Sequence, residues 1–205
     1  MLGFILSKMN LLILVVAVFA IVSYFTTSFI LVTIDKEAQI VVDRAKRMAD
    51  SLVNSPSYCD SVRYALPPAL SVSGGEQFYV MKISASDISE SGAGEKELKY
   101  LVFQIFRRKD PAHAIAADSF ITSATIRMFG ETDGVWGEVT DGVFADPQAA
   151  VPTNEIIFVK EVVGGQPIVY IIPCNSGTCT ADKDRVGKDF VRAQNLPDEE
   201  GGFRC

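Results

Sequence analysis

The chain has 205 residues, with 19 Lys and Arg, 25 Asp and Glu, and a formal net charge of −6. This mild acidity, without clusters of basic residues, argues against nucleic acid as a partner. We expect residues 1–56 to form a helical rod. Residues 57–205 are long enough to form one head domain with its own core.

Residues 9–34 form an apolar run without a charged side chain. The hydrophobic region of a cleaved signal is typically about 7–15 residues long, so this run exceeds it. A bilayer core requires roughly 20 apolar residues in a helix. We therefore expect a retained membrane-spanning helix.

The charges that flank the run bear on its orientation. Lys8 precedes it, whereas Lys36, Arg44, Lys46 and Arg47 follow it, and the positive-inside rule alone would place the head in the cytoplasm. Large domains can nevertheless translocate despite flanking charges, and the cysteines of the head resemble disulfide partners. We expect the N-terminus inside and the head outside.

The charged continuation is amphipathic and carries no Gly or Pro before Pro56. Asp43 precedes Arg47 by four residues, which is the spacing of a helical ion pair. A residue before proline is disfavoured in a helix, so we expect the helix to end near Asn54. The predicted apolar face of this continuation recurs with helical spacing and comprises Ala38, Val41, Val42, Ala45, Met48, Ala49 and Leu52.

Small residues also share one face of the apolar run. They are Ala17, Ala20, Ser23 and Thr27. Small residues let apolar helices approach one another closely, although the same composition could be incidental in a simple anchor. The long amphipathic extension favours packing of helix on helix.

The head is predicted to be rich in β-structure. Residues 77–84 and 99–107 combine aromatic and β-branched side chains at strand length, and residues 119–129 form another expected strand. Residues 155–163 and 166–172 flank Gly164-Gly165, a two-residue hairpin signature. Pro167 favours an edge position for the second of these strands.

Residues 130–154 repeat Thr-Asp-Gly-Val, which we interpret as two turns. The expected fold class is therefore α+β. A long hydrophobic-to-amphipathic helix precedes an antiparallel β-rich head, either one sheet or a compact sandwich, packed on the outer half of the helix.

All four cysteines lie in the head: Cys59, Cys174, Cys179 and Cys205. An even number in an external domain indicates disulfides, with three possible pairings. Cys174 and Cys179 enclose a turn-forming segment and pair most easily, which leaves Cys59 for Cys205. A four-cysteine zinc site is disfavoured because the spacing lacks paired CxxC elements.

Catalytic motifs are scarce, so we expect neither an enzyme nor a cofactor. His113 has no evident partner, and the sequence contains no GxSxG nucleophile elbow and no Walker loop. The acidic segment at residues 182–189 departs from the calcium-loop pattern, and we interpret it as a charged turn.

Several of these features occur together in one protein family. Gly3-Phe4 near the start, the uninterrupted hydrophobic helix, its amphipathic continuation and the disulfide-bearing β-rich head resemble a type IV pilin-like protein of the archaeal kind. In that family, the hydrophobic helices of many subunits bundle into a filament core, and the heads form the outer surface. The resemblance implies copies of the same chain as partners, and a membrane location before assembly.

The expected function is that of a structural subunit of a cell-surface filament. The alternative is a monomeric single-pass membrane protein with an outward-facing binding or adhesion domain. The anchored domain requires only the apolar run, whereas the filament also requires the small-residue face and the amphipathic stripe.

Overall fold

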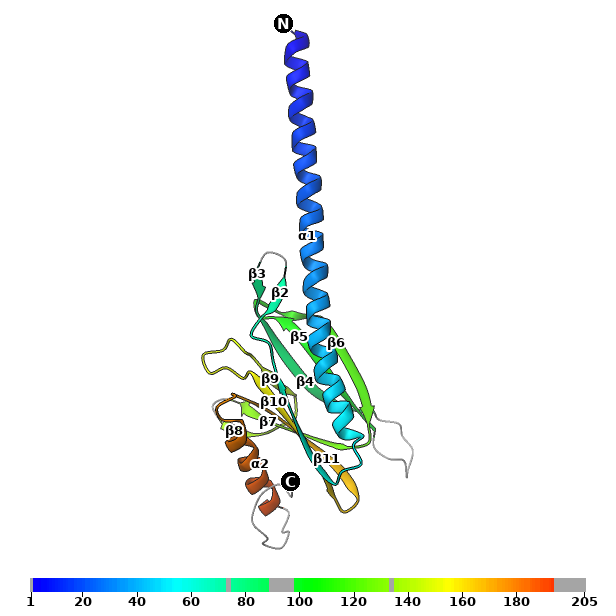
Figure 1. Cartoon of the computed structure of the whole chain (residues 1–205), viewed down its shortest axis with the longest axis vertical. Helices are drawn as coiled ribbons and strands as arrows, with labels where there is room; N and C mark the ends of the chain where they lie inside the picture. Colours follow the sequence, from blue (N-terminus) through cyan, green and yellow to red (C-terminus); the bar gives the residue numbers. More distant parts are fainter. Residues whose placement is uncertain (1, 73–74, 89–97, 133–134, 194–205) are drawn as a thin grey trace.

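The computed structural model describes residues 2–72, 75–88, 98–132 and 135–193. Helix α1 (Leu2–Val53) runs for 52 residues without interruption, and its N-terminal part projects from the head (Figure 1). It ends one residue before the predicted position. The side-chain amide of Asn54 donates to the carbonyl of Asp50 and so satisfies part of the helix terminus.

The rest of the described chain is mainly β-structure, which confirms the α+β class. Its elements are β1 (Cys59–Ala65), β2 (Leu70–Val72), β3 (Gly75–Gln77), β4 (Tyr79–Ile88), β5 (Leu98–Arg107), β6 (Asp110–Thr122), β7 (Thr125–Thr132), β8 (Val135–Val139), β9 (Val143–Ala145), β10 (Glu155–Val163), β11 (Gln166–Cys174) and α2 (Cys179–Ala193). One sheet has the order β1-β10-β11-β7-β8 and the other β6-β5-β4-β9, while β2 and β3 form a separate pair.

The two larger sheets face one another across the main core, and the C-terminal half of α1 completes that core. The helix contacts β6 most extensively, and it also contacts β1, the edge strand of the other sheet. On the opposite side, β9 lies against β7 and β11. The helix is therefore a structural part of the head and not an appendage to it.

The predicted hairpin at Gly164-Gly165 is confirmed, but the position of its second strand is not. The two glycines have φ angles of 59° and 81°, the left-handed conformation that a tight hairpin turn requires. Strand β11 is central and not at an edge. Its parallel pairing with β7 begins at Ile168, so Pro167 lies just outside the stretch in which that neighbour needs an N–H donor.

Three other differences from the sequence prediction result from long-range packing. Residues 119–129 do not form one strand, because the chain leaves one sheet at Thr122 and enters the other at Thr125. Residues 130–154, which the sequence analysis interpreted as two turns, contain strands β8 and β9. The β7–β11 pair is parallel, whereas the other pairs are antiparallel among the described strands.

The predicted charged turn at residues 182–189 is instead part of helix α2. Val186 in this helix is fully buried against the outer face of the five-stranded sheet, beside Val159 and Tyr170. Charged residues make up much of α2 and obscure its helical pattern in the sequence.

Candidate functional site

The amphipathic half of α1 packs its apolar stripe into the head. Six of the seven stripe residues are buried, namely Ala38, Val41, Val42, Ala45, Ala49 and Leu52. Met48 differs from the prediction because its side chain is 36% exposed, at a hollow between the helix and β1. Ile34, which the predicted stripe does not include, is buried. The edge of the head therefore reaches α1 near Ile34.

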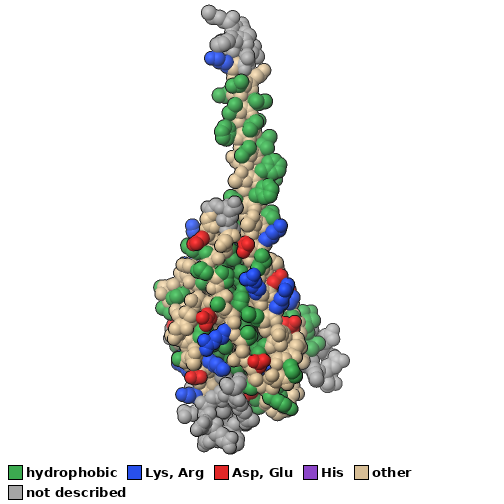
Figure 2. Space-filling model, viewed as in Figure 1, with side chains coloured by type: hydrophobic (Ala, Val, Ile, Leu, Met, Phe, Trp, Pro, Cys, Tyr) green, Lys and Arg blue, Asp and Glu red, His purple; other side chains and the backbone are tan. Residues whose placement is uncertain are grey.

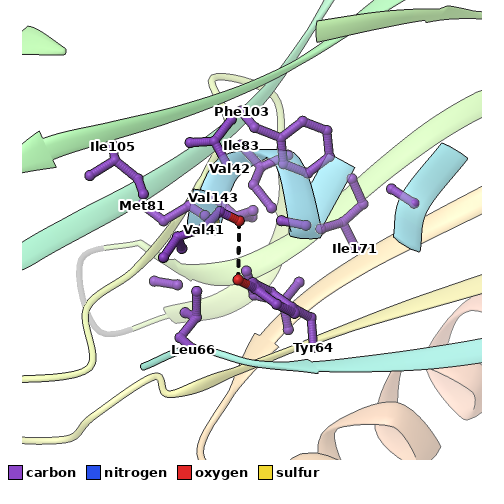
Figure 3. Close-up of a cluster of buried hydrophobic side chains, with 14 of the residues drawn as sticks. Val41, Val42, Tyr64, Leu66, Met81, Ile83, Phe103, Ile105, Val143 and Ile171 are labelled. Carbon is purple, nitrogen blue, oxygen red and sulfur yellow. Dashed lines mark hydrogen bonds between the residues drawn. The ribbon is translucent and has the colours of Figure 1, made fainter. Parts of the chain in front are cut away.

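A buried tyrosine links the head directly to the helix backbone. The hydroxyl of Tyr64 on β1 donates to the carbonyl of Val41 at 3.0 Å, among the apolar side chains shown in Figure 3. Burial raises the pKa of Tyr64 to about 12. The hydroxyl therefore remains protonated, and able to donate, throughout the physiological pH range.

An ion pair fixes the other side of this half of the helix. Lys46 Nζ lies 2.8 Å from the carboxylate of Asp118 on β6. The predicted pair between Asp43 and Arg47 does not form, because Asp43 accepts a hydrogen bond from Gln39 at 2.8 Å. The hydrogen bond from Lys46 lowers the pKa of Asp118 below its usual value, and the backbone N–H of Ser119 adds to this effect.

The lowered pKa predicts a pH-dependent contribution to stability. Because Asp118 is more acidic in the folded state, its contribution is present above the unfolded pKa of about 3.9. It is lost as the pH falls through the folded value. Asp118→Asn should lower the free energy of unfolding at pH 7 by no more than about 1 kcal/mol, and by less at pH 2–3. Denaturant titration of the detergent-solubilised chain at both pH values measures this difference.

Asp87→Asn is the control, because Asp87 pairs with Lys99 at 3.0 Å while its side chain is 65% exposed. We expect it to produce a smaller effect. If the Asp118 variant lost equal stability at both pH values, the ion pair would not be the cause.

A buried lysine of the head donates hydrogen bonds to backbone carbonyls at the C-terminal end of the helix. Lys160 on β10 is 5% exposed, and its ammonium donates to the carbonyl of Val53 at 2.8 Å and to the carbonyl of Ser55. The last carbonyls of a helix lack partners within the helix, and a cation near them also interacts favourably with the helix dipole. Lys160 therefore stabilises the C-terminal end of α1, just before the chain continues into β1.

The apolar half of α1 is left uncovered by the head. Its large side chains from Met9 to Val32 are exposed, except that of Ile30, which packs against the core of the head. Phe19, for example, is 69% exposed and Phe29 is 71% exposed. Hydrophobic side chains surround this projecting part, while most charged side chains lie on the head (Figure 2). Among the described residues, α1 is the one helix long and apolar enough to cross a membrane.

The polar side chains of this half are partly satisfied by the helix itself. The hydroxyls of Thr26, Thr27 and Thr33 each donate to the backbone carbonyl four residues earlier. Such bonds let threonine enter an apolar environment without an unsatisfied donor. This surface can therefore be buried in lipid or against another apolar helix.

The small-residue stripe lies on the side of α1 that the head covers further along. Three of its members precede a buried residue by 18 positions, which equals five turns of about 3.6 residues. The pairs are Ala20 with Ala38, Ser23 with Val41 and Thr27 with Ala45. These three residues extend the buried stripe into the uncovered half. Ala17 lies beside it, because Asp35, 18 positions later, is exposed. The bulky Tyr24, which precedes the buried Val42 by the same interval, lies within it. The head thus covers only part of one continuous stripe.

One predicted disulfide is present in the described part of the chain. Cys174 and Cys179 are linked, and the bond joins the end of β11 to the start of α2. Cys59 is also disulfide-bonded, but its predicted partner, Cys205, lies outside the described residues. The pairing of Cys59 with Cys205 remains a prediction.

The side chains considered for chemistry do not converge. His113 is 85% exposed near the start of β6, 3.8 Å from Asp110. Asp182 and Asp184 lie on α2, where Asp182 accepts a hydrogen bond from Thr178. Within the ranges that the structure describes, no three His, Cys, Asp or Glu side chains form a potential metal site.

Comparison of the chain with protein-family models, with curated proteins and with solved structures finds no match. The features available for assigning a function are therefore a long apolar helix and the disulfide-bearing β-rich head that covers part of it.

Proposed function

We propose that this chain is a structural subunit of an extracellular pilin-like filament of the archaeal kind. It would assemble through its N-terminal helix and present the β-rich head on the surface. The observation that carries the proposal is the continuity of the stripe on α1. The head buries this stripe at Ala38 and Ala45 and leaves Ala20 and Thr27, five turns earlier, without a covering surface.

Neighbouring copies of the same helix suit the uncovered stripe. Small side chains allow two helix backbones to approach closely, and van der Waals packing then stabilises the pair. Exposed phenylalanines on other faces, including Phe19, Phe25 and Phe29, provide bulky surfaces for further neighbours. The partners are thus copies of this chain, and a membrane would cover the helix before assembly.

The disulfide between Cys174 and Cys179 supports an outward-facing head, since disulfides persist mainly in oxidising compartments outside the cytosol. In this arrangement Lys8 lies on the inner side of the membrane before assembly. The proposal assigns no catalytic step and no cofactor to the chain.

A second candidate is a monomeric single-pass protein with an extracytoplasmic binding or adhesion domain. It is favoured by the length and apolar character of α1, because a bilayer would cover the same side chains. It leaves unexplained why the small residues align with the stripe that the head buries.

The two candidates differ in what shearing releases from cells. We expect sheared surface material to contain filaments, visible by negative-stain electron microscopy, whose tryptic peptides after reduction include residues 48–63 or others from the head. Recovery of the chain only from the membrane fraction, under conditions in which it is abundant, would favour the monomeric anchored domain.

A further inference from the structure

A groove of about 910 Å³ opens on the head where β8, β9 and the start of α2 meet. Apolar side chains contribute to it, including Phe144 and Val151, which are 56% and 76% exposed. The described residues that line it include no lysine or arginine. Its acidic members are Glu131, Glu138, Asp141 and Asp182. We refer to this feature as the acidic groove.

Two of these carboxylates are available to an external partner. Glu138 lies 3.6 Å from Arg127, and Asp182 accepts a hydrogen bond from a threonine hydroxyl. Glu131 and Asp141 are exposed, and neither has an ion-pair partner among the residues described. Two cations lie at the edge of the groove: Lys82 Nζ is 5.4 Å from the ring centroid of Phe144, and the guanidinium of Arg185 is 4.7 Å from that of Trp136. Glu131 and Asp141 are therefore the carboxylates that the groove offers to a partner, beside exposed apolar surface.

A projecting turn of opposite charge lies elsewhere on the head. The half-buried Arg107 ends β5, and the connection to β6 carries Arg108 and Lys109. Residues 108–114 are all exposed. Arg108 pairs with Asp146 at 3.1 Å. Lys109 has no ion-pair partner in the part of the chain that the structure describes. We refer to residues 107–109 as the basic tip.

The two surfaces lie at different heights along the long axis of the molecule. The basic tip is at the end of the head from which α1 emerges, whereas β8 and α2 lie further from that end (Figure 1). Consider two parallel copies, one of them displaced along the helix axis in the direction that leads from the N-terminus of α1 to the head. The basic tip of the displaced copy then approaches the level of the acidic groove of the other copy.

We infer that the basic tip of one copy docks in the acidic groove of a second copy. This inference rests on the proposed filament and adds a contact between heads to the contact between helices. The two surfaces are different patches of one chain, so the contact is heterologous and can repeat without closing, as a filament requires. The acidic groove repels anionic lipid headgroups, and charge complementarity favours the basic tip.

Zero-length carbodiimide cross-linking of intact sheared material tests this contact without mutation. The reagent joins an amine to a carboxylate that is close enough to form an ion pair. Filaments assembled from mixed ¹⁴N- and ¹⁵N-labelled chains distinguish cross-links between copies from those within one copy. We expect mixed-label peptides that join Lys109 to Glu131 or Asp141, and none of these peptides in Lys109→Gln, which lacks the reacting amine. Absence of these peptides from intact filaments would overturn the inference and leave the filament itself unaffected.

Charge reversal supplies an independent test. Lys109→Glu alone, or Glu131→Lys with Asp141→Lys, should lower filament yield about tenfold, because like charges would face one another across the contact. All three changes in one chain should restore the yield. Lys188→Glu is the control for net charge, because Lys188 is an exposed lysine on α2.

Two outcomes would contradict parts of this account. If the triple variant did not recover filament yield while its head remained folded, the docking would be wrong. Absence of wild-type filaments, with cross-links present in membranes, would instead contradict the proposed function and retain the contact.

Discussion

Ala20→Phe should abolish the filaments or shorten them severely. Ala20 belongs to the small-residue stripe that continues the buried face of α1, and it is exposed in the single chain. A phenylalanine ring there would separate helices that approach closely, and overpacking typically costs about 1–3 kcal/mol. Because the same contact recurs at every subunit, the cost accumulates along the polymer. Filament yield after shearing, relative to membrane-bound subunit, measures the effect.

Membrane insertion and the folded head should survive this substitution. Phenylalanine is at least as favourable as alanine in a membrane-spanning helix, and residue 20 precedes the first buried position, Ile34, by 14 residues. Phe19→Leu is the matched control, since it changes a neighbouring exposed side chain outside the small-residue stripe. Equal filament yields from wild type and Ala20→Phe would show that this face packs against lipid alone, and the helix would then be a simple anchor.

Lys160→Met should lower the free energy of unfolding of the head by about 2–3 kcal/mol. Methionine retains much of the buried apolar stem but removes both hydrogen bonds to the carbonyls of Val53 and Ser55. Hydrogen bonds to charged groups contribute about 1.5–3 kcal/mol, and buried acceptors without partners add a further cost. Chemical denaturation of the detergent-solubilised chain, monitored by near-ultraviolet circular dichroism, measures the loss.

Lys188→Met is the matched control for the loss of a lysine, because Lys188 is exposed on α2. It should change the free energy of unfolding by less than about 0.5 kcal/mol. If Lys160→Met were equally mild, the carbonyls at the end of α1 would not depend on this lysine. The position of the rod on the head would then depend on apolar packing alone.

The C-terminal end of the helix and the buried stripe could be predicted from the sequence because both depend on local pattern. Helical spacing places Ala38, Val41 and Ala45 on one face, and the approach to Pro56 ends the helix. The boundaries of that stripe could not be predicted in the same way. Met48 has the required spacing and is apolar, yet the neighbouring strands do not cover it, whereas they do cover Ile34.

The same distinction applies to the basic tip and the acidic groove. Each charged residue is visible in the sequence, but Glu131, Asp141 and Asp182 come from separate elements. Only the crossing of the chain from β6 into β7, and the placement of α2 on the five-stranded sheet, bring them to one groove. The periodicity of a short segment cannot predict that these three residues line the same groove.

The sequence by itself determined the continuous helix, the Gly164-Gly165 hairpin and the disulfide between Cys174 and Cys179, because each depends on residues close together in the chain. Tertiary structure alone decided the parallel pairing of β7 with β11 and the central position of β11. It also decided the burial of Lys160 beneath the end of α1. The physical reason is that these features join segments far apart in the chain. Their free energies depend on which surfaces meet when the two sheets close around the helix.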